Sequence, residues 1–121
     1  GRHDEARAAY AGALGVVERH MDLNPDDPRA ATIRAVSLCR LGERDEGLRW
    51  AREVLAIDPR DAGVRYNVAC IHAIEGAKDE AIALLTEAIR AGFGNREWFA
   101  RDPDLASLHG DPRFEALLGG M

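Results

Sequence analysis

Apolar residues recur along the chain three and four positions apart, with polar residues between them. This spacing places the apolar side chains on one face of an α-helix. In the first segment, residues 3–23, the apolar positions are Ala6, Tyr10, Ala13, Leu14, Val17 and Met21. The same pattern predicts four further helices, over residues 28–41, 45–57, 61–75 and 78–91. The fold class that follows is all-α.

Proline, glycine and aspartate mark where these helices begin and end. Pro25 and Pro59 end the first and third helices, because the residue before a proline is pushed out of the helical region. Asp27 suits the N-cap of the second helix, since its carboxylate accepts hydrogen bonds from free backbone N–H groups. Gly42 and Gly76 fit the left-handed residue that follows a helix without steric penalty. The second and third helices, and the fourth and fifth, are therefore predicted to form hairpins.

The two hairpins repeat each other. Residues 62–93 align with residues 28–59 after a shift of 34 positions, and Ala69 then falls on Ala35 while Gly76 falls on Gly42. A helix–turn–helix unit with this period is the signature of a helical repeat. The two alanines are expected where paired helices come close, because a larger side chain would separate them.

The tail has a different composition, with two Asp-Pro steps, one of them preceded by glycine. It predicts three short pieces, over residues 95–101, 103–108 and 112–118, with an aspartate capping each piece that a proline begins. Their apolar residues are Trp98, Phe99, Leu105, Leu108, Phe114, Leu117 and Leu118. The end of a helical-repeat array must be covered. We therefore expect the tail to cover the last hairpin, with Trp98 in its core; the alternative is that Trp98 anchors a partner.

Bulk properties narrow the function. A chain of 121 residues suits one small domain. The net charge of −5 and the pI near 5.3 argue against a nucleic-acid partner, which needs a basic face. There is no membrane-spanning apolar run and no signal-peptide pattern. Cys39 and Cys70 fit no metal spacing and are expected as free thiols, with a reactive thiol or a disulfide as alternatives. These features favour a cytoplasmic location.

At these residues the sequence resembles the tetratricopeptide repeat (TPR) family. Ala35 and Ala69 match the small eighth residue of a repeat, Gly42 and Gly76 the glycine seven positions later, and Pro59 the proline near its end. The C-terminal half, from YNVACIHAIEG through the tail, is similar to the "end-of-group" TPR cap of bacterial multidomain cyclases and Ser/Thr kinases. The resemblance implies a right-handed superhelix and a regulatory or scaffolding part of a larger protein.

The resemblance also divides the chain and shows departures. It implies one TPR-like domain over residues 1–121: a partial repeat at 1–25, repeats at 26–59 and 60–93, and a cap at 94–121. Phe93 replaces the last proline, Leu38 and His72 replace the usual tyrosine, and Arg34 stands where leucine is common.

No catalytic constellation is present in the sequence. A metal site formed by His72, Glu75 and Cys39 is a weak alternative to a packed histidine. The acidic pairs at residues 45–46 and 79–80 are expected at helix N-termini, where the helix dipole stabilises negative charge. We expect no enzyme activity, no metal and no cofactor.

The resemblance implies that first helices line a concave groove. The groove positions in this sequence are Arg29, Thr32, Val36, Cys39, Arg40, Tyr66, Asn67, Cys70 and Ile74. The family often uses an asparagine at the place of Asn67 to hold a peptide backbone, since an amide donates and accepts hydrogen bonds. Arg40 and Arg101 are candidates to pair with an acidic group. Thr32 and Val36 replace residues that a full carboxylate clamp needs.

The predicted function is therefore protein–protein interaction through this groove. The alternative is a structural or self-association role as the cap of a longer helical array. A homodimer is then expected through the edge formed by the first helix, and Trp50 is a further candidate for a dimer contact.

Overall fold

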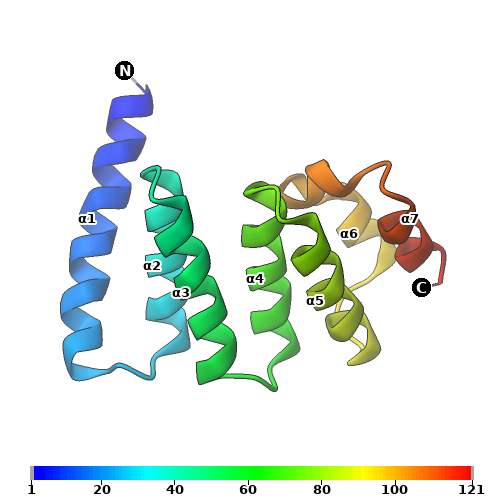
Figure 1. Ribbon diagram of the computed structural model, residues 1–121, viewed down its shortest axis with the longest axis horizontal. Coiled ribbons are helices and arrows are strands. Elements are labelled where there is room, and N and C mark those ends of the chain that lie inside the picture. The colour runs from blue at the N-terminus through cyan, green and yellow to red at the C-terminus, as the bar shows by residue number, and fades with distance from the viewer. Residues whose placement is uncertain (1, 121) are drawn as a thin grey trace. The chain divides into compact units, whose positions relative to one another are not determined.

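The computed structural model describes residues 2–120, which fold into helices with no strand among them (Figure 1). The α-helices are α1 (Arg2–Leu23), α2 (Pro28–Arg40), α3 (Arg44–Ile57), α4 (Ala62–Ile74), α5 (Lys78–Arg90), α6 (Arg96–Arg101) and α7 (Pro112–Gly119), and η1 (Pro103–Leu108) is a 3₁₀ helix. The all-α prediction and the order of helices are confirmed. The chain forms two compact units, Gly1–Pro59 and Arg60–Met121, and each is described by itself.

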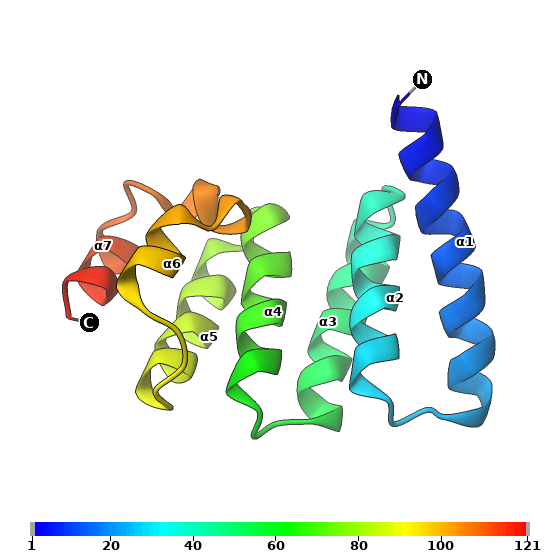
Figure 2. The same ribbon diagram turned by 180° about the vertical axis from the view of Figure 1, so that it is seen from behind.

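In the first unit, α2 packs against both α1 and α3 (Figure 2). The α2–α3 turn is closed by Gly42, whose φ of +88° is in the left-handed region. The two helices approach closely at Gly47 of α3. A Cβ atom there would lie 2.9 Å from the backbone nitrogen of Cys39 and 3.0 Å from the carbonyl oxygen of Ala35. The hairpin therefore depends on a residue without a side chain at this position.

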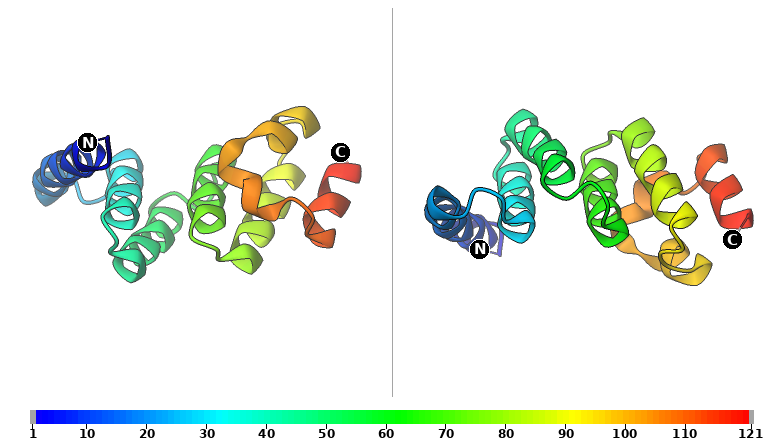
Figure 3. Two further views of the ribbon diagram at one scale, coloured as in Figure 1. Left: turned by 90° about the horizontal axis from the view of Figure 1, so that it is seen from above. Right: turned by 90° about the horizontal axis from the view of Figure 1, so that it is seen from below.

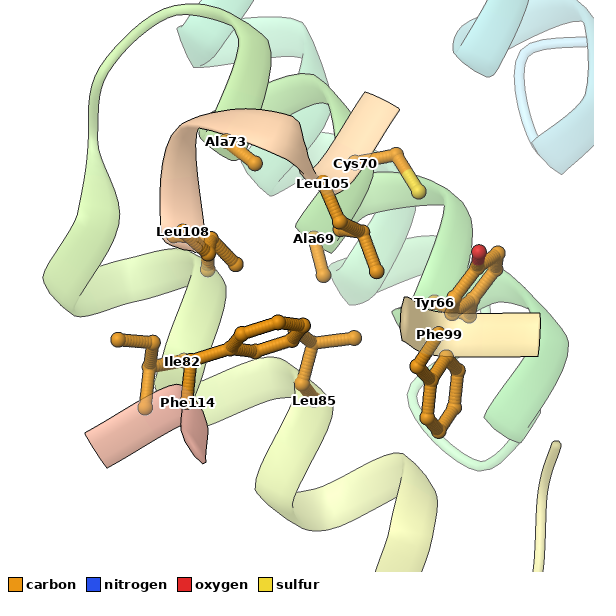
Figure 4. Packing of buried hydrophobic residues seen from close by; sticks show 11 residues of the cluster. Tyr66, Ala69, Cys70, Ala73, Ile82, Leu85, Phe99, Leu105, Leu108 and Phe114 are labelled. Carbon is orange, nitrogen blue, oxygen red and sulfur yellow. The ribbon is translucent and has the colours of Figure 1, made fainter. Parts of the chain in front are cut away.

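The second unit is a hairpin of α4 and α5 covered by the tail. η1 packs on α4, and α7 contacts both α5 and α6. Figure 4 shows side chains of α4, α5 and the tail converging on one core. Its largest fully buried members are Phe99, Phe114, Leu85, Leu105 and Leu108. The expectation that the tail covers the last hairpin is thus confirmed.

Local hydrogen bonds hold the tail in this path, which Figure 3 shows from two sides. Asn95, Asp102 and Asp111 are the N-caps of α6, η1 and α7, and each side chain accepts a hydrogen bond from a backbone N–H of its helix. The hydroxyl of Ser107 donates to the carbonyl oxygen of Ala73 on α4 over 2.7 Å. The aspartates therefore act as the caps that the Asp-Pro steps predict.

Trp98 departs from the expected core position. Its side chain is 44% exposed, whereas Phe99 is 1% exposed. Successive side chains of a helix point about 100° apart, so the neighbouring rings of Trp98 and Phe99 cannot both face the core. In α6 it is Phe99 that points inward. Trp98 instead rests on the outside of the core, with its ring centroid 5.1 Å from that of Tyr66 and 5.3 Å from that of Phe93.

Candidate partner-binding surfaces

The first candidate surface lies on α2 and is formed by Arg29, Thr32, Ile33, Val36 and Arg40. α2 begins at the N-cap Asp27, whose carboxylate accepts hydrogen bonds from the N–H groups of Arg29 and Ala30 at 3.0 and 3.3 Å. This cap fixes where the helix begins. Its small residues Ala30, Ala31, Ala35 and Ser37 then face inward, and the α2 surface is left at least partly exposed.

The α2 surface has a positively charged side chain near each end and apolar side chains between them. Arg29 and Arg40 stand near its two ends, with Ile33 (45% exposed) and the half-buried Val36 between them. Within residues 2–120, neither guanidinium makes an ion pair. Thr32 is already engaged, because its hydroxyl donates to the carbonyl oxygen of Pro28 over 2.7 Å. The free groups of this surface are thus two cations around an apolar centre.

Of the expected groove residues in the second unit, Asn67 is exposed on α4 and Arg101 is exposed at the end of α6. Tyr66 and Cys70 are buried, at 5% and 6% exposed, and belong to the core (Figure 4). The Tyr66 hydroxyl donates a hydrogen bond to Asp102, which joins α4 to the tail. Tyr66 and Cys70 therefore offer little surface to a partner, while Asn67 and Arg101 are accessible.

A shallow depression lies on the tail and includes Arg101. It is lined by Asn95, Glu97, Trp98, Arg101, Asp102 and Pro103. The Trp98 ring forms an aromatic wall supported from behind by Tyr66, Phe93 and Phe99. Aromatic rings held in this way are common anchors at protein interfaces. We name the exposed residues Asn67, Trp98 and Arg101 the cap surface.

Trp50, the other tryptophan, packs beside two arginine side chains in the first unit. The guanidinium carbon of Arg34 is 4.0 Å from the centroid of the Trp50 ring, a cation–π distance, and that of Arg49 is 5.2 Å away. Arg34 also pairs with Glu18 at 3.6 Å, and Arg49 with Glu46 at 2.9 Å. Arg34, which departs from the family pattern, is thus a packing partner of the half-buried Trp50. A partner that bound Trp50 in a dimer would have to compete with this contact.

One group of potential metal ligands occurs in the described residues: Cys70, Asp102 and Asp104, with ligand atoms within 4.8 Å of one another. Burial, aided by the negative charge of Asp104, raises the pKa of the Cys70 thiol to about 12. A thiol that keeps its proton is a poor metal ligand. His72, which the sequence offered as a weak metal alternative, is buried and lies 3.4 Å from Glu80.

Two parts of the candidate surfaces were not predicted from the sequence. Ile33 belongs to the α2 surface, and the helical spacing of four from Arg29 would have identified it. The cap surface around Trp98 depends on contacts between α4 and the tail, for which the sequence carries no local signal. Among the described residues, no helix is long and apolar enough to cross a membrane.

Paired antiparallel helices of this kind define an all-α helical-repeat class. No family model matches the sequence. The chain is 30% identical over 83 residues to interferon-induced protein with tetratricopeptide repeats 3 of Mus musculus. The aligned region covers 69% of this chain and 21% of that protein. It therefore spans about a fifth of the length of this curated relative. The similarity supports a TPR-like helical family.

Proposed function

We propose that the chain is a protein-interaction module that binds a peptide or protein through the exposed side of α2, and that exposed residues of α4 and the tail offer a further contact surface on the second unit. The observation that carries the proposal is the α2 surface, where Arg29 and Arg40, which form no ion pair within residues 2–120, flank Ile33 and Val36. Forming a salt bridge with these arginines would not require an internal ion pair to break. The similarity to a TPR protein points to an interaction module without catalysis.

The proposal includes the full set of expected contact residues: Arg29, Thr32, Val36, Arg40, Tyr66, Asn67, Cys70 and Arg101. Of these, the exposed Arg29, Arg40, Asn67 and Arg101 are assigned direct contacts, and the others shape the surface. Asn67 supplies both a donor and an acceptor for a peptide backbone. A regulatory or scaffolding role within a larger protein, and a cap related to those of bacterial signalling proteins, belong to the same proposal.

The test starts from capture by the wild-type chain in an extract of its source cells. A captured protein is identified, purified and titrated by calorimetry against wild type, the double variant Asn67→Ala/Arg40→Ala and the control Arg90→Ala, which alters an exposed arginine of α5. We expect the double variant to bind at least about tenfold more weakly, since charge-assisted contacts contribute about 1.5–3 kcal/mol each. Equal affinity of all three proteins would remove α2 and α4 from the proposal.

A further inference from the structure

One side of α1 carries a stripe of exposed residues. Within the described chain, α2 is the one element that packs extensively on α1, through Val17 and Met21. The α1 stripe lies away from Val17 and Met21 and consists of Glu5, Ala8, Gly12, Val16 and Arg19. Ala8 is at its edge and also lines a shallow depression with Leu41 and Glu43 of the α2–α3 turn. Val16 is 58% exposed, and Leu23, which continues the stripe, is 86% exposed.

The α1 stripe is complementary to itself when reversed. Glu5 and Arg19 stand seven residues before and after Gly12, and Ala8 and Val16 stand four residues before and after it. Two antiparallel copies of α1 that cross at Gly12 would therefore place Glu5 of each copy opposite Arg19 of the other. The apolar residues Ala8 and Val16 would meet in the same way. A two-fold symmetric interface forms each of these contacts twice.

Gly12 gives an independent reason for a close helix approach at this point. Glycine destabilises the interior of a helix relative to alanine. The fold does not require it, because a Cβ atom at Gly12 would meet nothing within 4 Å. Gly47, by contrast, is required by the backbone of α2. At the centre of a symmetric helix pair, a residue without a side chain lets the two backbones approach closely.

We propose that the α1 stripe is a self-association surface, whose occupant is α1 of a second copy, antiparallel and centred on Gly12. The interface goes beyond the proposed partner binding, since it uses neither the α2 surface nor the cap surface. The contact is small and framed by exposed ion pairs, so the dimer is expected to be weak and to dissociate at high salt.

Sedimentation velocity over a concentration series tests the register. We expect Glu5→Lys and Arg19→Glu each to weaken dimerisation about tenfold, since two attractive pairs become repulsive. The double variant carries both changes, so each ion pair forms again with its two charges exchanged. It should therefore recover the wild-type dissociation constant. Both positions are exposed, and circular dichroism checks that the variants fold. A double variant as weak as the single variants, or a wild-type chain that stays monomeric at millimolar concentration, overturns the proposal.

Cross-linking tests the centre of the interface separately. Gly12→Cys places two thiols together at the two-fold axis, and mild oxidation should give a disulfide-linked dimer. The control Ala83→Cys, exposed on α5, should stay monomeric. Equal cross-linking of the two variants would show non-specific collision and contradict the register. The variant Asn67→Ala/Arg40→Ala should dimerise like wild type, so failure of partner binding and failure of self-association are distinguishable.

Discussion

At the scale of single residues, burial decides how Cys70 behaves. The residue is 6% exposed, and burial together with Asp104 raises the pKa of its thiol to about 12. The thiolate is the reactive form, so at pH 8 Cys70 is almost entirely in its unreactive, protonated form. Cys39, in contrast, is partly exposed beside the α2–α3 contact.

We therefore predict that Cys70 resists thiol reagents in the native protein. In a Cys39→Ser variant, labelling by a colorimetric disulfide reagent at pH 8 should be roughly 100-fold slower or more than in urea, where the pKa returns to its ordinary range. The Cys70→Ser variant reports Cys39 under the same conditions. Native labelling of Cys70 at the rate of the unfolded chain would contradict the assigned burial.

Asp27 makes the stability of the first unit depend on pH in the acid range. A hydrogen bond from His20 at 2.7 Å, with further bonds from the N–H groups of Ala30 and Arg29, lowers the pKa of Asp27 below its ordinary value of 3.8. The unfolded state therefore binds a proton at a higher pH than the folded state does. Stability from this group is complete above about pH 5 and is lost as the pH falls through the folded-state pKa.

The corresponding prediction uses Asp27→Asn. Asparagine is also a good N-cap but does not titrate, so the loss of stability between about pH 5 and 2.5 should be smaller than in wild type. Urea unfolding followed by Trp50 fluorescence across this range measures the difference. The control Asp26→Asn removes an exposed neighbouring carboxylate that does not cap the helix. If the two substitutions had the same effect, the loss of stability at acid pH would have to come from other carboxylates.

At the scale of helices, residue type placed most boundaries correctly. Proline, glycine and aspartate act on the backbone within a few residues, and so the predicted hairpins and the three pieces of the tail agree with the structure to within about one residue. Side chains brought together from distant segments were not predictable in this way. Tyr66 meets Asp102 across 36 positions, and whether Trp98 or Phe99 turns inward is decided by that packing.

Two glycines within helices are predicted to respond oppositely to alanine. Gly47→Ala places a methyl group against the backbone of α2, and overpacking of this kind costs about 1–3 kcal/mol, more than the gain in helix propensity. Gly12→Ala meets open space and should raise the free energy of unfolding by up to about 1 kcal/mol. Chemical denaturation at concentrations where the chain is monomeric compares the two. A stabilising Gly47→Ala would show that α2 and α3 separate without cost.

At the scale of the whole molecule, the chain divides into two compact units. Leu85 is fully buried in the second unit, so Leu85→Ala should lower the stability of that unit by about 2–5 kcal/mol. Trp50 and Trp98 are the chain's two tryptophans, one in each unit, and variants with either one replaced by phenylalanine report the units separately. We predict a large shift of the Trp98 transition and a smaller shift of the Trp50 transition. Equal shifts would show that the chain unfolds as one cooperative body.

The return of η1 onto α4 also has a consequence for the rate of folding. In the first unit, every extensive contact joins helices adjacent in sequence, whereas η1 reaches α4 only after α5 and α6 have been passed. Closing a longer loop costs more entropy before its contacts form, and chains with more distant contacts fold more slowly. In a stopped-flow experiment Trp50 should therefore reach its native fluorescence before Trp98. During synthesis from the N-terminus, the first unit would then be folded while the residues that complete the second core are still being added.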